Sequence, residues 1–191
     1  WRVSVLKITS TTFLVVQYGG ITAAVVATLD KDTLVITLGT YKEQAVTKPM
    51  YESQAKDYRY RIDAHLMCTS NSKVAIVGWW SDGSVPVIDT LTISGTTITW
   101  VGTTLLSALT SDGTRGSIKY ADNKLIIYHH STNCSVATVT YSNDADTSPA
   151  IIDTENGTTS ALGFMMKVTA AGRFTMFQAG NLEFFDINSS D

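Results

Sequence analysis

The run Val74-Ala-Ile-Val-Gly-Trp79 is short and apolar, and three other runs in the chain are similar to it. These are Phe13-Leu-Val-Val-Gln-Tyr18, Leu125-Ile-Ile-Tyr-His-His130 and Phe174-Thr-Met-Phe-Gln-Ala179, so that the four runs begin 61, 51 and 49 residues apart. Short runs rich in Val, Ile and aromatic residues, separated by Gly, Asn, Asp and Ser, predict β-strands joined by turns. Helical periodicity is almost absent. The sequence therefore predicts an all-β chain with an internal repeat.

Each apolar run is the second strand of a larger predicted unit. The preceding strands are expected at 3–9, 61–69, 116–121 and 162–169, and the following ones at 21–29, 85–93, 135–141 and 182–187. The first three units add a fourth strand at 33–38, 97–101 and 149–153, whereas the fourth unit lacks one. A four-stranded antiparallel meander of about 50 residues has the size of a β-propeller blade.

The predicted fold is therefore a β-propeller-like arrangement of about four four-stranded antiparallel blades, with the last one incomplete. We expect a single domain over 1–191, with units at about 1–46, 60–108, 114–154 and 160–187 and an insertion loop at 47–59. One blade cannot bury two apolar faces alone, so neighbouring blades must stack. The alternatives are part of a larger propeller, a small four-bladed ring and a trimeric β-fibre.

The unit from Lys73 to Gly102 carries a resemblance to a known group of proteins. It runs as an apolar strand, the turn Ser81-Asp-Gly-Ser84, an alternating strand, the hairpin Ser94-Gly-Thr-Thr97 and a strand ending in Gly. This order resembles the propeller-type repeats of tail-fibre and other virion proteins of bacteriophages. The resemblance implies a propeller fold, a place in the virion, and contacts with other virion proteins or a host-surface glycan as part of an oligomeric assembly.

Composition excludes two classes of partner. Only 16% of the 191 residues are charged and the net charge is -3, so no positive field is available to hold a phosphate backbone. The longest apolar stretches, such as 74–77 and 125–128, are far shorter than the roughly 20 residues of a membrane helix. We expect neither nucleic-acid binding nor membrane insertion. With 28 Thr and 18 Ser, the polar surface is hydroxylic rather than ionic.

The two cysteines and the three possible N-glycosylation sites do not determine the cellular compartment of the protein. The spacing of Cys68 and Cys134 matches no zinc site. We expect both to be free cysteines that pack as small residues in or near strands, and the alternative is a single disulfide bridge between them. Triplets at Asn133, Asn156 and Asn188 fit the glycosylation pattern, which arises easily by chance in a chain rich in Ser and Thr.

Groups for catalysis are few, and we predict no catalytic residue, no metal and no cofactor. His129 and His130 are adjacent, so in a strand they point to opposite faces and cannot chelate one metal. His65 is expected in a strand with a structural role. The alternative is a sialidase-like glycoside hydrolase on a propeller scaffold. For that activity the pairs Asp144/Asp146 and Asp153/Glu155 have the spacing that shares one strand face.

The sequence offers better candidates for a binding site than for a catalytic site. Trp79 and Trp80 precede the turn that contains Asp82, and an exposed indole beside Asp and Ser can stack on a sugar. The insertion contributes Tyr51, Tyr58 and Arg59, residue types favoured at interfaces.

The alternative interpretation of the two tryptophans is that their rings fill gaps between blades. The alternative for the insertion is a plain connecting loop. The predicted function is a non-enzymatic structural and adhesion module of a virion. The rivals are the glycoside hydrolase and a secreted or cell-surface carbohydrate-binding protein.

Overall fold

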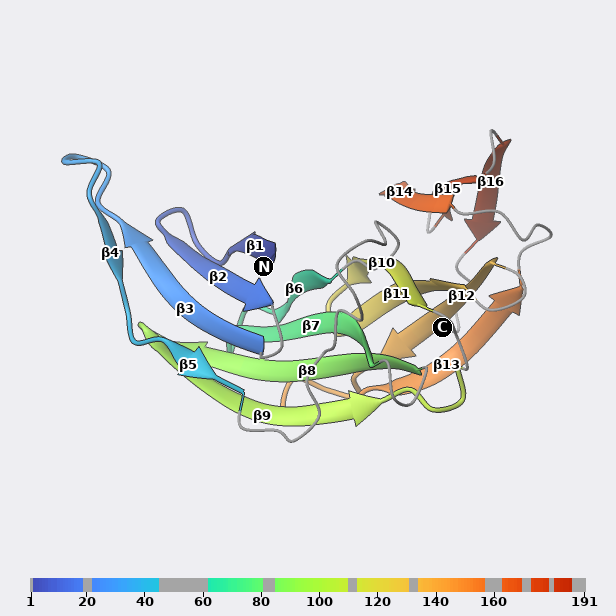
Figure 1. The fold of residues 1–191 in the computed structure, drawn as a ribbon, viewed down its shortest axis with the longest axis horizontal. Helices are drawn as coiled ribbons and strands as arrows, with labels where there is room; N and C mark the ends of the chain where they lie inside the picture. The colour runs from blue at the N-terminus through green and yellow to red at the C-terminus, as the bar shows by residue number, and fades with distance from the viewer. Residues whose placement is uncertain are drawn as a thin grey trace.

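The computed structural model describes residues 2–18, 22–44, 62–80, 85–109, 113–130, 134–156, 163–169, 173–178 and 181–186 (Figure 1). Within these ranges the chain forms sixteen β-strands and no helix, so the prediction of an all-β chain is confirmed. The predicted insertion at 47–59 lies outside the described residues.

The strands form four antiparallel sheets, each made of consecutive strands. Sheet 1 has the order β1 (Arg2–Lys7), β2 (Thr12–Tyr18), β3 (Thr22–Leu29) and β4 (Ile36–Leu38), and β5 (Lys42–Glu43) also pairs with β3. Sheet 2 contains β6 (Asp63–Cys68), β7 (Lys73–Trp80), β8 (Val85–Ser94) and β9 (Thr97–Leu105). Sheet 3 contains β10 (Gly113–Ala121), β11 (Lys124–His130), β12 (Cys134–Thr140) and β13 (Ala150–Asn156). Sheet 4 contains β14 (Gly163–Thr169), β15 (Arg173–Gln178) and β16 (Asn181–Asp186).

The four apolar runs occupy equivalent places in the four sheets. Phe13, Val74, Leu125 and Phe174 are each the second residue of the second strand. Each second strand pairs with the first strand on one side and the third on the other. The repeat seen in the sequence is therefore a repeat of structure, and equivalent residues can be compared between sheets.

Sheets 1 and 2 pack face to face through one apolar cluster. Leu14 and Val16 of β2 lie against Val74 and Ile76 of β7, and all four side chains are fully buried. β3, β8 and β9 add further residues to this cluster, namely Ala24, Val26, Val87, Leu91, Ile93 and Ile98. The first interface is thus built from the central strands of both sheets.

Sheets 2 and 3 pack through a second cluster. Ala75 and Val77, on the opposite face of β7, lie with Leu125 and Ile127 of β11. Alternate residues of β7 therefore face opposite neighbours, as the period of two along a strand requires. A strand with a covered sheet on both faces has a continuously apolar sequence, because no residue of it faces water.

The first strands lie along the inside of the stack. β1 contacts β6, β6 contacts β10, and β10 contacts β14. Figure 1 shows the four sheets following one another along an arc, with sheet 1 at the left end and sheet 4 at the upper right. The arc brings loops from different sheets to common ends of the stack.

Several local features differ from the sequence expectation. The short strand β5 was not foreseen, and β6 and β10 carry irregularities opposite the start of the second strand, at Met67 and Tyr120. Asn123 and Gly95 have the positive φ expected of tight turns, 62° and 59°. After the expected turn at 30–32, however, the residue with positive φ is Leu34, at 57°.

Candidate functional site

Two inner strands bring an acid, an imidazole and a hydroxyl together. Asp63 and His65 are two residues apart on β6 and share a face, and Ser117 of β10 lies opposite them. His65 Nε2 lies 2.8 Å from Ser117 Oγ. Asp63 Oδ2 accepts hydrogen bonds from the Ser117 backbone N–H at 2.8 Å and from its hydroxyl at 3.3 Å. These bonds join sheet 2 to sheet 3 at the inner strands.

The order of these bonds decides what the cluster can do. Desolvation lowers the pKa of His65, and the charge of Lys119 lowers it further, while Asp63 acts in the opposite direction. A neutral imidazole beside a hydroxyl is the start of a nucleophilic site. In such sites the carboxylate orients the imidazole, whereas here Asp63 bonds to the serine. The geometry therefore fits a link between strands better than an activated nucleophile.

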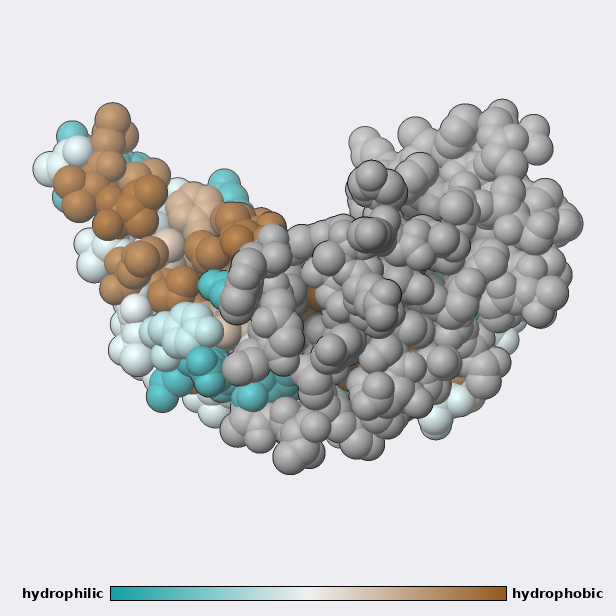
Figure 2. Space-filling view, in the orientation of Figure 1, coloured by the Kyte–Doolittle hydropathy of each residue, from teal (hydrophilic) through white to brown (hydrophobic). Residues whose placement is uncertain are grey.

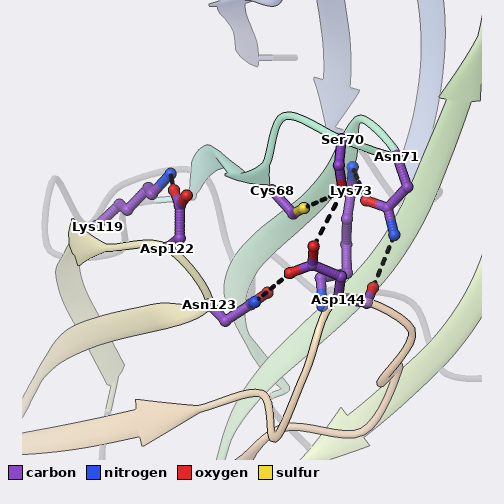
Figure 3. Close-up of polar contacts among 8 residues, drawn as sticks. All are labelled: Cys68, Ser70, Asn71, Lys73, Lys119, Asp122, Asn123 and Asp144. Carbon is purple, nitrogen blue, oxygen red and sulfur yellow. Dashed lines mark hydrogen bonds and ion pairs between the residues drawn. The ribbon is translucent and has the colours of Figure 1, made fainter.

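A second polar cluster joins the same two sheets at the β6–β7 turn (Figure 3). Asp144, in the loop between β12 and β13, accepts hydrogen bonds from Ser70 Oγ at 3.0 Å and from Asn123 Nδ2 at 2.6 Å. The Asn71 side chain donates to the Asp144 backbone carbonyl at 2.7 Å. Hydrogen bonds from Cys68, Asn123 and Ser70 lower the pKa of Asp144. The carboxylate is thus held by residues from two sheets.

Lys73 completes this second cluster from within the stack. Its side chain is buried, and Nζ donates to the backbone carbonyls of Asn143 at 2.9 Å and Asp146 at 3.1 Å. The same ammonium group lies 4.2 Å from the centre of the Tyr141 ring, a cation–π distance. Desolvation lowers the pKa of Lys73, while nearby acidic groups act in the opposite direction. We call this arrangement the clamp around Lys73, because two carbonyl acceptors and one aromatic ring hold the buried ammonium group in place.

Asp89 forms the corresponding polar link between sheets 1 and 2. Its Oδ1 accepts a hydrogen bond from Thr103 Oγ1 at 2.6 Å, and Thr103 accepts one from Gln44 Nε2 at 3.0 Å. The other carboxylate oxygen, Oδ2, is buried without a hydrogen-bond partner. Desolvation raises the pKa of Asp89 to about 6. This link is therefore weaker than the clamp around Lys73.

Most residues predicted for binding lie where side chains are not described. Trp79 and Trp80 are the last two residues of β7, and nothing further is described of their rings. Asp82, Tyr51, Tyr58 and Arg59 lie outside the described residues. The prediction of a binding surface at these residues therefore stays a prediction.

The predicted acid pairs differ from each other in the structure. Asp144 and Asp146 lie in the β12–β13 loop, so they do not share the strand face that the glycoside-hydrolase alternative would need. Asp146 accepts hydrogen bonds from the backbone of Ser142 at 2.7 Å and Ser148 at 2.9 Å, and these bonds lower its pKa. Asp153 and Glu155 do lie on one strand, β13, and are exposed.

Cys68 and His129 are two further buried titratable groups. Cys68 is a free, buried thiol whose Sγ lies 3.0 Å from Ser70 Oγ, so the bridge to Cys134 that the sequence left open does not form. His129 is buried on β11. No group of three or more His, Cys, Asp or Glu residues suited to a metal occurs in the described part of the chain. Nor does that part contain a helix long and apolar enough to cross a membrane.

Sequence reasoning missed an exposed apolar face on sheet 1. Large hydrophobic side chains stay exposed on β1, on β4 and at the tip between β3 and β4, namely Val3, Val5, Leu34, Val35, Ile36 and Leu38. Figure 2 shows hydrophobic residues gathered at this end of the molecule. The signal was present in the alternation of the predicted strands, but only the order of the sheets reveals which face lacks a neighbour.

Comparison of the chain with protein-family models found no match, and searches of curated proteins and of solved structures found none either.

Proposed function

We propose that the four sheets are blades of a propeller-like ring and that the chain is a non-enzymatic structural and adhesion module of a virion. The observation that carries the ring is the contact of successive first strands, β1 with β6, β6 with β10 and β10 with β14. Blades around an axis place one edge strand each at the centre and stack through their faces. The equivalent slots of Phe13, Val74 and Leu125 support the same arrangement.

The described polar clusters support a passive role over catalysis. Asp63, His65 and Ser117 bond to one another across two sheets, and Lys73 and Asp144 are held by several partners each. Groups engaged in this way stiffen the scaffold, because a change of rotamer would break hydrogen bonds between the sheets and would leave the buried ammonium group of Lys73 without its acceptors. A stiff scaffold suits a module whose work is to present loops.

The ligand surface in this proposal is the end of the stack where β7 meets the turn at 81–84. Trp79 and Trp80 are adjacent in a strand, so one of the two rings is expected to face outward; beside Asp82 it would combine a flat apolar surface with a hydrogen-bond acceptor, which is the chemistry that recognises a sugar ring. A host-surface glycan or a neighbouring virion subunit would bind there. The tail fibre of a bacteriophage, or a related tail protein, is the setting implied by the repeats of the second unit.

The test is binding of the purified chain to immobilised bacterial lipopolysaccharide and capsular polysaccharide. We expect retention on at least one polysaccharide, and at least tenfold weaker binding after Trp80→Ala, as for an aromatic residue at the centre of an interface. Asp82→Ala should also weaken binding, whereas Asp122→Ala, at a turn of sheet 3, should leave it unchanged. Release of reducing sugar from the bound polysaccharide would instead establish a glycoside hydrolase. Retention of neither polysaccharide would remove the glycan role.

A further inference from the structure

The inner strands of sheets 2 and 3 are joined by two kinds of contact. At the β10–β11 turn, the backbone N–H of Asn123 donates to the Met67 carbonyl of β6 at 3.0 Å, and neither group titrates. Further along the two strands, Asp63 and His65 of β6 meet Ser117 of β10. An acid and an imidazole form this second contact, so the binding of protons can change it, whereas the first contact is insensitive to pH.

His65 lies on the face of sheet 2 that packs against sheet 3. Its cross-strand partner on β7 is Ala75, which is fully buried in the apolar cluster between these two sheets. The next residue, Leu66, pairs with Val74 and packs towards sheet 1 instead. The imidazole is itself partly buried. A proton that binds His65 would therefore place a positive charge inside the contact between sheets 2 and 3.

The charges around His65 compensate only in part for such a proton. β6 contacts β1, β7 and β10, and the other charged residues of these four strands are Arg2, Lys7, Asp63, Lys73, Arg115 and Lys119. Asp63 is the only acid in these four described strands, and its Oδ2 accepts hydrogen bonds from Ser117. Lys119 shares the face of Ser117 on β10, so its positive charge opposes protonation of His65.

The other charged groups have partners or positions of their own. The ammonium group of Lys73 donates to two carbonyls of the β12–β13 loop. β1 packs on the opposite face of β6, where Leu6 joins the cluster between sheets 1 and 2. Lys119 forms an ion pair with Asp122 of the β10–β11 turn. Asp63 and Lys119 are therefore the two charges that act on His65 within the contact.

We propose that Asp63, His65 and Ser117 form a pH-sensitive latch, which holds the inner strands of sheets 2 and 3 together at neutral pH and releases them in mild acid. In the closed latch the imidazole bonds to the serine, and Asp63 accepts the backbone N–H of Ser117. In the open latch water hydrates the imidazolium, and the two strands separate locally. The latch depends on contacts between β6 and β10 alone, so it requires neither a closed ring nor a bound ligand.

The direction of the pH effect follows from the two states of the latch. In the closed latch desolvation lowers the pKa of His65 below its ordinary value of 6.5; Asp63 acts in the opposite direction, and Lys119 lowers the pKa further. A hydrated imidazole recovers the ordinary pKa, so the open latch binds the proton more tightly than the closed one. The latch is therefore at full strength above pH 6.5 and weakens as the pH falls below that value.

The backbone N–H of Ser117 reports the latch directly, because its acceptor is Asp63 of the other sheet. The experiment is hydrogen exchange of the full chain, followed by NMR between about pH 8 and pH 5, with each rate divided by the intrinsic rate at that pH. We expect the Ser117 amide to exchange about three- to tenfold faster towards pH 5, the factor that one net hydrogen bond is worth. The Asn123 amide, which joins the same two sheets, should show no such change. An equal acid response of both amides would overturn the latch, because it would indicate general unfolding.

Two variants assign the acid response to the imidazole. His65→Gln keeps a side chain that can bond to Ser117 but cannot titrate, so the acid response of the Ser117 amide should disappear. Lys119→Gln removes the charge that opposes protonation, so the response should become smaller than in wild type. Lys124→Gln, at the start of β11, is the matched control and should respond as wild type does. A response that persists unchanged in His65→Gln would contradict the proposal.

A titration of the wild-type chain gives a second readout that needs no variant. The imidazole protons of His65, identified by through-bond correlation to its backbone, are followed by NMR over the same pH range. They should titrate with a pKa below the ordinary value of 6.5. A pKa of 6.5 or higher would overturn the latch, because acid would then leave the contact unchanged or strengthen it.

Discussion

The two inter-sheet interfaces whose side chains the structure describes have similar apolar cores but different polar contacts. Sheets 1 and 2 meet through residues such as Leu14 and Val74, and sheets 2 and 3 through residues such as Val77 and Leu125. The second interface adds the clamp around Lys73 and the inner-strand bonds of Ser117. Repetition thus supplies the stacking, while residues that do not repeat fix how particular sheets meet.

The two interfaces also respond to acid in opposite directions. Burial raises the pKa of Asp89 between sheets 1 and 2, so protonation favours the folded state there. Hydrogen bonds from residues of both sheets lower the pKa of Asp144 between sheets 2 and 3, so protonation favours unfolding there. The difference means that no single pH is optimal for both contacts.

The largest expected effects test whether the apolar cores of the two interfaces contribute equally to the free energy of unfolding. Leu14→Ala and Leu125→Ala each remove a fully buried side chain, one from each interface, and should each lower the free energy of unfolding by about 2–5 kcal/mol. Urea titration followed by circular dichroism measures this. Val3→Ala, on the exposed part of β1, should cost less than about 0.5 kcal/mol. A Leu14→Ala cost near that of the control would show that sheet 1 folds outside the stack.

Unfolding as a function of pH should separate the interfaces through Asp89. Its pKa rises from 3.8 to about 6 on folding, so its contribution is fully present below pH 4 and is lost as pH rises through 6. We expect wild type to lose about 2–3 kcal/mol across that window on this account. In Asp89→Asn, the free energy of unfolding should change less with pH across this window than in wild type. An unchanged slope in the variant would mean that Asp89 does not carry the effect.

The clamp is tested by Lys73→Met, which keeps the length of the side chain and removes its charge. Two backbone carbonyls lose the charged donor that holds them, so we expect a loss of about 1.5–3 kcal/mol in the free energy of unfolding. Lys124→Met, the neighbouring repeat position on β11, should cost no more than about 0.5 kcal/mol. Stability equal to wild type after Lys73→Met would make the clamp dispensable.

The smallest effect is expected from Asp144→Asn. The lowered pKa of Asp144 means that its contribution is present above pH 3.8 and is lost as pH falls below that value. The variant should therefore show a shallower loss of stability below pH 4 than wild type in acid titrations. Asp122→Asn controls for removing a surface charge, and a variant curve that follows wild type would contradict the assignment.

Local sequence was sufficient for the strands and insufficient for the contacts between sheets. The short apolar runs and the turn residues between them predicted the second strands, from Phe13 to Phe174, within one residue of their observed starts. Nothing local to Lys73 indicates that its ammonium group lies among backbone carbonyls 70 and 73 residues away. The bond from Ser117 to His65 spans 52 residues and is equally invisible in the sequence.

Candidate binding residues show the same division. Aromatic and turn residues around Trp80 were found by composition, since flat rings near acceptors are a local signal. The open face of sheet 1 needed the order of the sheets, because the apolar run of β2 is similar to that of β7, where both faces are covered.

Consecutive strands make up every described sheet, and this has a mechanical consequence. Each meander closes its hydrogen bonds with its own neighbours in sequence, so its strands can pair during synthesis, and its apolar faces are covered once the next sheet is made. Pulling on the two ends of the chain should likewise extract meanders one after another, in a sawtooth of separate ruptures.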